Sequence, residues 1–133
     1  MKVLHTSHVR PPVRQPRLLG TSILIVEDEP LIALDLHAAL SAAGAGIIAA
    51  TDIAEALRLI RRNVVSAAVL DVNIGDRDCT AVCQALLHNG IPFLFHTGYP
   101  DAPIVRAWPE IPVLRKPISH AEVVDRVADI VHG

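Results

Sequence analysis

Five side chains along the sequence are of the kinds that bind metal ions and phosphate: Glu27, Asp28, Asp71, Thr97 and Lys116. Carboxylates held together repel each other by about 4 kcal/mol per pair at a separation of about 4 Å in a partly polar site. A divalent ion with oxygen ligands such as Mg²⁺ resolves that repulsion, and it also binds phosphate oxygens. Lys116 adds a compact positive charge and Thr97 a hydroxyl donor. The set predicts a phosphoryl site with Asp71 as carboxylate nucleophile.

Each of these residues follows or ends a short apolar segment with the length of a β-strand. The sequence contains five such segments, which cover residues 22–26, 46–50, 67–70, 91–95 and 112–114. They are apolar throughout rather than alternating, which is typical of parallel strands covered on both faces. We therefore expect the functional side chains at the carboxyl ends of the strands, where open α/β sheets bind their ligands.

Helical patterns separate the apolar segments. They begin at Pro30, after an Asp52 cap, after a cap at Asp76 or Asp78, weakly after Asp101, and after a Ser119 cap. We predict an α/β fold, a doubly wound five-stranded parallel sheet in the flavodoxin-like order 2-1-3-4-5 with helices on both faces. In that order the first and third strands are neighbours, so the acids at their ends converge.

The chain from about residue 22 to residue 131 resembles the receiver domains of bacterial two-component response regulators. The resemblance rests on Glu27-Asp28 in ILIVEDEP, Asp71 in AAVLDVNIG, Thr97 in FLFHTGY and Lys116 in LRKPIS. Successive intervals are 43 residues from Asp28 to Asp71, 26 more to Thr97 and 19 more to Lys116. Each motif alone is weak, but the four in this order, each at a strand end, are specific.

The resemblance implies Mg²⁺-dependent phosphoryl transfer from a histidine kinase or a histidine phosphotransfer protein to Asp71, which becomes an aspartyl-phosphate. It also implies a metal site in which Asp28 and Asp71 bind directly, Glu27 binds through water, and the backbone carbonyl of Asn73 completes the set. The Lys116-Pro117 peptide is often cis in such domains. The chain would then be no enzyme beyond its own phosphotransfer and dephosphorylation, with output through contacts to an unknown downstream protein.

One position departs from the common pattern of the family. Three residues before Lys116, where the family commonly has a switching aromatic residue, this chain has Val113. The sequence approximates a subgroup, frequent in alphaproteobacteria, with a Phe-x-Thr-Gly loop and no such aromatic, whose members often work with HWE-type kinases. Gly98 should make the loop after the fourth strand mobile, so we hypothesise that loop 97–103 carries the switch through Thr97 and Tyr99.

Composition and charge narrow the class of protein. Hydrophobic residues make up 51% of the chain, and the net charge of −2 divides into +4 for residues 1–20 and −6 for the rest. An acidic body argues against nucleic-acid binding, and no apolar run is long enough to span a membrane. We expect a disordered basic tail at 1–20, a receiver domain at 21–133, a cytoplasmic location and a possible homodimer.

Alternatives stay open beside this interpretation. A degenerate receiver that acts only as a phosphorylation-independent interaction module is the first. An aspartate-nucleophile phosphatase is less favoured, because those enzymes usually carry Asp-x-Asp after the first strand, where this chain has Glu-Asp-Glu. We interpret Cys79 and Cys83 as buried thiols rather than a metal pair, and His96 as a packed histidine on the opposite face from Thr97.

Overall fold

The computed structural model describes residues 16–133 of the chain. The elements, in chain order, are β1 (Ser22–Val26), α2 (Pro30–Ala42), β2 (Gly46–Ala50), α3 (Ile53–Arg62), β3 (Ala67–Leu70), β4 (Asn73–Ile74), β5 (Arg77–Asp78), α4 (Thr80–His88), β6 (Phe93–Thr97), α5 (Pro103–Ala107), β7 (Val113–Arg115) and α6 (His120–His132).

Five of the strands form one parallel sheet in the order β2-β1-β3-β6-β7. This order confirms the predicted flavodoxin-like topology, with β6 and β7 as the fourth and fifth strands. Val26, the last residue of β1, is in register with both Ala50 and Leu70, the last residues of its two neighbours. The segments that follow β1 and β3 therefore start side by side at the carboxyl edge of the sheet.

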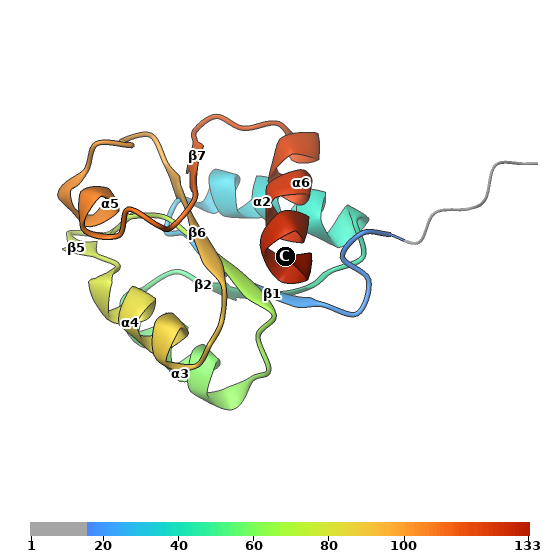
Figure 1. The fold of residues 1–133 in the computed structure, drawn as a ribbon, viewed down its shortest axis with the longest axis horizontal. Coiled ribbons are helices and arrows are strands. Elements are labelled where there is room, and N and C mark those ends of the chain that lie inside the picture. Colours follow the sequence, from blue (N-terminus) through green and yellow to red (C-terminus); the bar gives the residue numbers. More distant parts are fainter. Residues whose placement is uncertain (1–15) are drawn as a thin grey trace, which may run out of the picture.

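Helices cover both faces of this sheet (Figure 1), with α2 and α6 packed together on one face and α3 and α4 on the other. The alternation of side chains along β1 sorts the core into two layers. Ile23 and Ile25 pack with the α2–α6 layer, whereas Leu24 and Val26 pack with the α3–α4 layer. Because the sheet is covered twice, its strands are apolar at every position, as the sequence pattern indicated.

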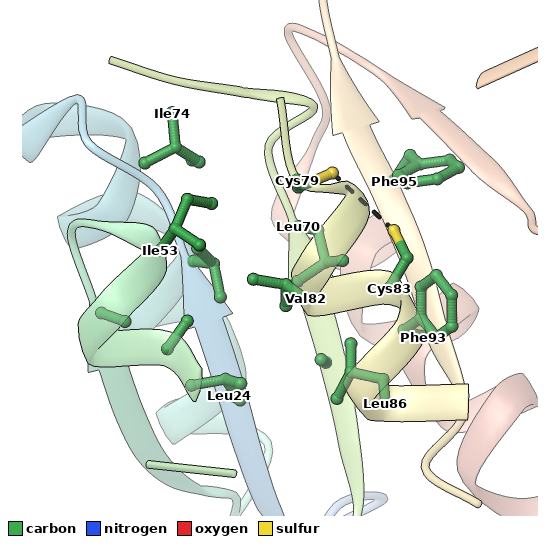
Figure 2. Close-up of a cluster of buried hydrophobic side chains, with 14 of the residues drawn as sticks. Leu24, Ile53, Leu70, Ile74, Cys79, Val82, Cys83, Leu86, Phe93 and Phe95 are labelled. Atoms are coloured by element: carbon green, nitrogen blue, oxygen red, sulfur yellow. Dashed lines mark hydrogen bonds between the residues drawn. The ribbon is translucent and has the colours of Figure 1, made fainter. Parts of the chain in front are cut away.

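The two cysteines lie in the α3–α4 layer (Figure 2), and neither side chain is exposed to solvent. Their Sγ atoms are 3.8 Å apart, next to the aromatic rings of Phe93 and Phe95. The hydrogen bond between the thiols and their burial raise the pKa of Cys79 far above its ordinary value. The prediction of buried thiols is confirmed.

Two expected boundaries shift in the structure. The fourth sheet strand covers Phe93–Thr97 rather than residues 91–95, because β7 pairs with Phe95, His96 and Thr97. Helix α4 has Cys79 as its N-cap rather than an aspartate. Asp78, one residue before this N-cap, accepts a hydrogen bond from the backbone N–H of Thr80 at 3.0 Å.

Residues 16–20, which we expected to belong to the tail, pack on the domain. Leu18 is fully buried in the α2–α6 layer, and its N–H donates to the carbonyl of Ala43 at 2.8 Å. Arg17 forms an ion pair with Asp125 of α6. The predicted boundary at residue 20 is therefore too late, because one apolar side chain anchors this segment. Residues 1–15, where the prediction of disorder also falls, lie outside the described residues.

Within residues 16–133, no helix combines the length and the apolar character that crossing a membrane requires.

Candidate functional site

Three acidic side chains meet at the carboxyl edge of the sheet. Glu27 and Asp28 directly follow β1, Asp71 directly follows β3, and one carboxylate oxygen of each lies within 4.8 Å of the others. Glu27 is 1% exposed, Asp71 is half-buried and Asp28 is exposed, so the group runs from the interior to the surface. The structure thus brings together the acids that the sequence analysis singled out.

Lys116 contacts two of these three acids. Its Nζ lies 2.9 Å from Oε1 of Glu27 and 3.4 Å from Oδ2 of Asp71. The lysine follows β7, and its backbone N–H donates to the carbonyl of Thr97 at 2.8 Å, which fixes its position against β6. The Lys116-Pro117 peptide is cis, as the resemblance implied. Burial lowers the pKa of Lys116, but Glu27 and Asp71 outweigh burial and raise it overall.

The site formed by Glu27, Asp28, Asp71 and Lys116 has more acidic groups than basic ones. Burial, and then the neighbouring Asp71, raise the pKa of Glu27 to about 7, although Lys116 acts in the opposite direction. Three carboxyl groups face one ammonium group. Such a site favours a further cation, and carboxylate oxygens are ligands that hard divalent ions prefer.

Thr97 is the last residue of β6 and is 1% exposed. Its Oγ1 accepts a hydrogen bond from the backbone N–H of Tyr99 at 2.8 Å. A hydroxyl group that accepts one hydrogen bond still has its proton to donate. The Thr97 hydroxyl group therefore contacts the loop that follows it and has a proton available for an anion at the site.

The antiparallel pair β4–β5 borders the acids, and the sequence analysis did not anticipate it. The backbone N–H of Asn73 donates to Oδ1 of Asp71 at 3.3 Å, and that of Gly75 donates to Oδ2 of Asp28 at 2.7 Å. Gly75 turns the chain with a φ of 64°, a conformation that favours glycine. The Gly75-Asp76 pair is a hairpin signal that was available in the sequence.

His96 lies beside Lys116, a neighbour that the sequence analysis did not predict for it. The side chain is 3% exposed and lines a cavity of about 350 Å³ with Lys116 and with Leu36 of α2. Leu36 belongs to the α2–α6 layer, so the expectation of a packed histidine on the opposite face from Thr97 is confirmed. Burial, and then the charge of Lys116, lower the pKa of His96 to about 4.

Residues 23–128 match the family model of the response regulator receiver domain. The matched range contains every acid of the site and all of the sheet except Ser22, the first residue of β1.

Three relatives show how far this likeness extends. The phyllosphere-induced regulator PhyR of Methylorubrum extorquens is 34% identical over 110 residues, which are 79% of this chain and 41% of PhyR. This chain thus spans about two fifths of the length of that curated relative. The solution structure of SdrG from Sphingomonas melonis Fr1 is 37% identical with a TM-score of 0.75, and the match covers 86% of this chain and 98% of SdrG.

The third relative is the receiver domain of a sensor histidine kinase from Pseudomonas aeruginosa, solved with a magnesium ion coordinated in its active-site cleft. It is 20% identical with a TM-score of 0.77, and the match covers 86% of this chain and 99% of that one. At this identity the likeness concerns the fold alone.

Proposed function

Because the chain belongs to the family of response regulator receiver domains, we propose that it accepts a phosphoryl group on Asp71 in Mg²⁺-dependent two-component signalling. The observation that carries the proposal is the grouping of Glu27, Asp28 and Asp71 within 4.8 Å, with the ammonium group of Lys116 against two of them. A nucleophile, a cation site and a fixed positive charge are the parts that phosphoryl transfer needs.

The donor set fits a resident Mg²⁺ ion. The carboxylates of Asp28 and Asp71 would bind it, Glu27 would act through water, and the backbone carbonyl of Asn73 would add a neutral oxygen. Asn73 lies in β4, and its own backbone N–H donates to Asp71. Its carbonyl group therefore belongs to the segment that borders the acids. A bound Mg²⁺ neutralises the negative charge that builds up on the transferring oxygens.

The reaction itself follows from the side chains present. A carboxylate oxygen of Asp71 attacks the phosphorus atom, the bond from phosphorus to the donor imidazole nitrogen breaks, and the electron pair returns to that nitrogen. Lys116, already 3.4 Å from Asp71, pairs with a phosphoryl oxygen. The Thr97 hydroxyl donates to another. The half-buried position of Asp71 leaves its carboxylate accessible to a donor at the surface.

The partners we propose follow from the same chemistry. The donor is a phosphohistidine on a sensor histidine kinase, of the HWE type by the resemblance of the Phe-x-Thr-Gly loop, or on a histidine phosphotransfer protein. Output passes through protein–protein contacts to a downstream protein, and a homodimer is one form that this contact can take. An activity beyond the chain's own phosphotransfer and dephosphorylation, and nucleic-acid binding, are not part of the proposal.

The test is the intact mass of the protein after incubation with acetyl phosphate or phosphoramidate and Mg²⁺. We expect wild type and Asp76→Asn, which alters an exposed acid outside the cluster, to gain one phosphoryl group. Asp71→Asn, and wild type with EDTA, should gain none. A wild-type protein that neither forms the adduct with either donor nor binds Mg²⁺ would instead be a degenerate receiver that acts as an interaction module.

A further inference from the structure

An apolar groove of about 440 Å³ lies at the amino ends of β6 and β7, at the opposite end of the sheet from the acidic site. Leu87, Ile91, Phe93, Ile111 and Ile130 are the large apolar residues that line it, and Asp129 is its charged residue. Leu87 is 61% exposed. An apolar surface of this kind, bordered by charge, is typical of a site that another segment covers.

The segment between α5 and β7 forms part of the groove's lining. Helix α5 covers only Pro103–Ala107, and the residues that follow it contribute Ile111 and Pro112 to the groove. Phe93 at the start of β6 contacts the ring of Trp108 edge to face, with the centroids 6.2 Å apart. Trp108 therefore packs on one of the residues that line the groove.

The first described residues of the chain contact α6, the helix that contributes Asp129 and Ile130 to this groove. Arg17 pairs with Asp125 of α6, and Nε2 of His132 lies 3.0 Å from the carbonyl oxygen of Arg17. Gly133, the next residue after His132, lines the groove. The described part of the chain therefore begins beside the last turns of α6.

The positive charge of residues 1–15 and the distance they can span favour this segment as the occupant of the groove. Residues 1–15 carry Lys2, Arg10 and Arg14 and no acid. Asp129 follows Asp125 by one helical turn, so it lies on the same face of α6, between the anchor of Arg17 and the groove. An extended chain spans about 3 Å per residue, so Arg14 reaches Asp129, and Val9 reaches across a helix about 10 Å wide.

We propose that the groove at the amino ends of β6 and β7 binds the chain's own N-terminal segment, with Arg10 and Arg14 over Asp129 and the apolar residues around Val9 in the groove. The interaction is intramolecular, and it places a basic segment on the face of the domain remote from Asp71. The proposal is independent of the phosphoryl chemistry.

The test uses the full chain with a nitroxide label on Ser7→Cys. The native thiols are fully buried, so the label attaches to the introduced cysteine. We expect the label to remove most of the NMR signal intensity of the Ile111 and Ile130 amides and of the Trp108 indole N–H, the sequence's one tryptophan. The amides of α3, on the other side of the domain from the anchor, should keep theirs.

Two variants make the test specific. Leu87→Glu places a charge in the groove at an exposed position and should restore the lost intensities, whereas Val64→Glu, at a residue 89% exposed outside the groove, should not. Equal broadening over the whole surface would overturn the proposal. So would broadening in a mixture of labelled unenriched protein with unlabelled ¹⁵N protein, because the occupant would then be the tail of a second copy.

Discussion

His96 is a buried titratable group with unsatisfied hydrogen-bonding atoms. Among residues 16–133, neither ring nitrogen has a hydrogen-bond partner. The charged groups whose fields reach the ring are Lys116, Asp71 and Asp35, and burial together with Lys116 dominates, which lowers the pKa of His96 to about 4. The imidazole is therefore neutral in the folded protein at neutral pH.

This burial predicts a stability that falls as the solution is acidified. Below pH 6.5 the unfolded chain protonates His96, whereas the folded protein does so only near pH 4. Because the unfolded state binds more protons in this window, its free energy falls relative to the folded state. At about 1.4 kcal/mol per pKa unit, the loss attributable to His96 reaches up to about 3 kcal/mol between pH 7 and pH 4.

Urea unfolding of wild type and His96→Met at several pH values between 7.5 and 4.5 measures this loss. Methionine fills a similar volume without polar hydrogens, so the variant should lose distinctly less stability on acidification. His88→Gln, at an exposed position on α4, should behave like wild type. Parallel loss of stability in wild type and His96→Met would show that the buried imidazole does not titrate as described.

The residues of the site differ in how far a sequence could predict them. Glu27, Asp28, Asp71, Thr97 and Lys116 were predicted to converge because each is a polar residue at the end of an apolar strand. The location of His96 beside Lys116 depends on how β6 and β7 pair and on how α2 covers them. That contact has no local signal, so only the tertiary structure shows it.

At the scale of elements, loop 97–103 connects the site to the surface through one hydrogen bond. Oγ1 of Thr97 accepts from the N–H of Tyr99, whose side chain is 70% exposed. If the Thr97 hydroxyl group turns toward a phosphoryl group on Asp71, the N–H of Tyr99 loses its acceptor. Val113, where the family commonly has an aromatic residue, packs against the α3–α4 layer and has no ring that can report this movement.

We therefore predict that a phosphoryl mimic such as beryllofluoride, added with Mg²⁺, changes the NMR relaxation and chemical shifts of residues 97–103. Thr97→Val removes the acceptor, so its loop should already be mobile and should change little when the mimic is added. Thr51→Val, at an exposed position away from the loop, should respond as wild type does. A wild-type loop whose relaxation is the same with and without the mimic would refute the switch.

Local patterns predicted the long elements well and the short ones poorly. The Asp52 and Ser119 caps are present, with hydrogen bonds from the N–H groups of Glu55 and Glu122 at 2.7 and 3.1 Å. The two strands of the β4–β5 hairpin have two residues each, too few for any periodicity. Leu18 is a similar case, because the pair Leu18-Leu19 after Arg17 is too short for any periodicity and does not show which leucine is buried.

At the scale of the whole molecule, repulsion among the acids of the site lowers the free energy of unfolding of the metal-free protein. Folding brings the ends of β1 and β3 together and gathers three carboxyl groups against one ammonium group. An ion that binds this group binds only the folded chain, because the acids are far apart in the sequence. Such binding adds about 2.7 kcal/mol to the free energy of unfolding when the ion is present at a hundred times its Kd.

Asp28→Asn should separate this repulsion from ion binding. The asparagine keeps an oxygen that can accept the 2.7 Å hydrogen bond from the N–H of Gly75, so the local backbone is preserved while one charge is removed. Because Asp28 is exposed, relief of the repulsion should raise the metal-free stability by only about 0.5–1 kcal/mol, or a few degrees in Tm. The same change should remove most of the stabilisation by Mg²⁺.

Thermal unfolding of wild type, Asp28→Asn and Glu29→Gln with EDTA and with Mg²⁺ measures both effects. Glu29 is the exposed acid next to Asp28 but lies outside the group of three, so its variant should keep the wild-type rise in Tm with Mg²⁺. Wild type should be the less stable protein in EDTA and the more stable one at saturating Mg²⁺, so the order of wild type and Asp28→Asn reverses. An equal response of these two proteins to Mg²⁺ would mean that the ion binds without Asp28 and that the acids do not form its site.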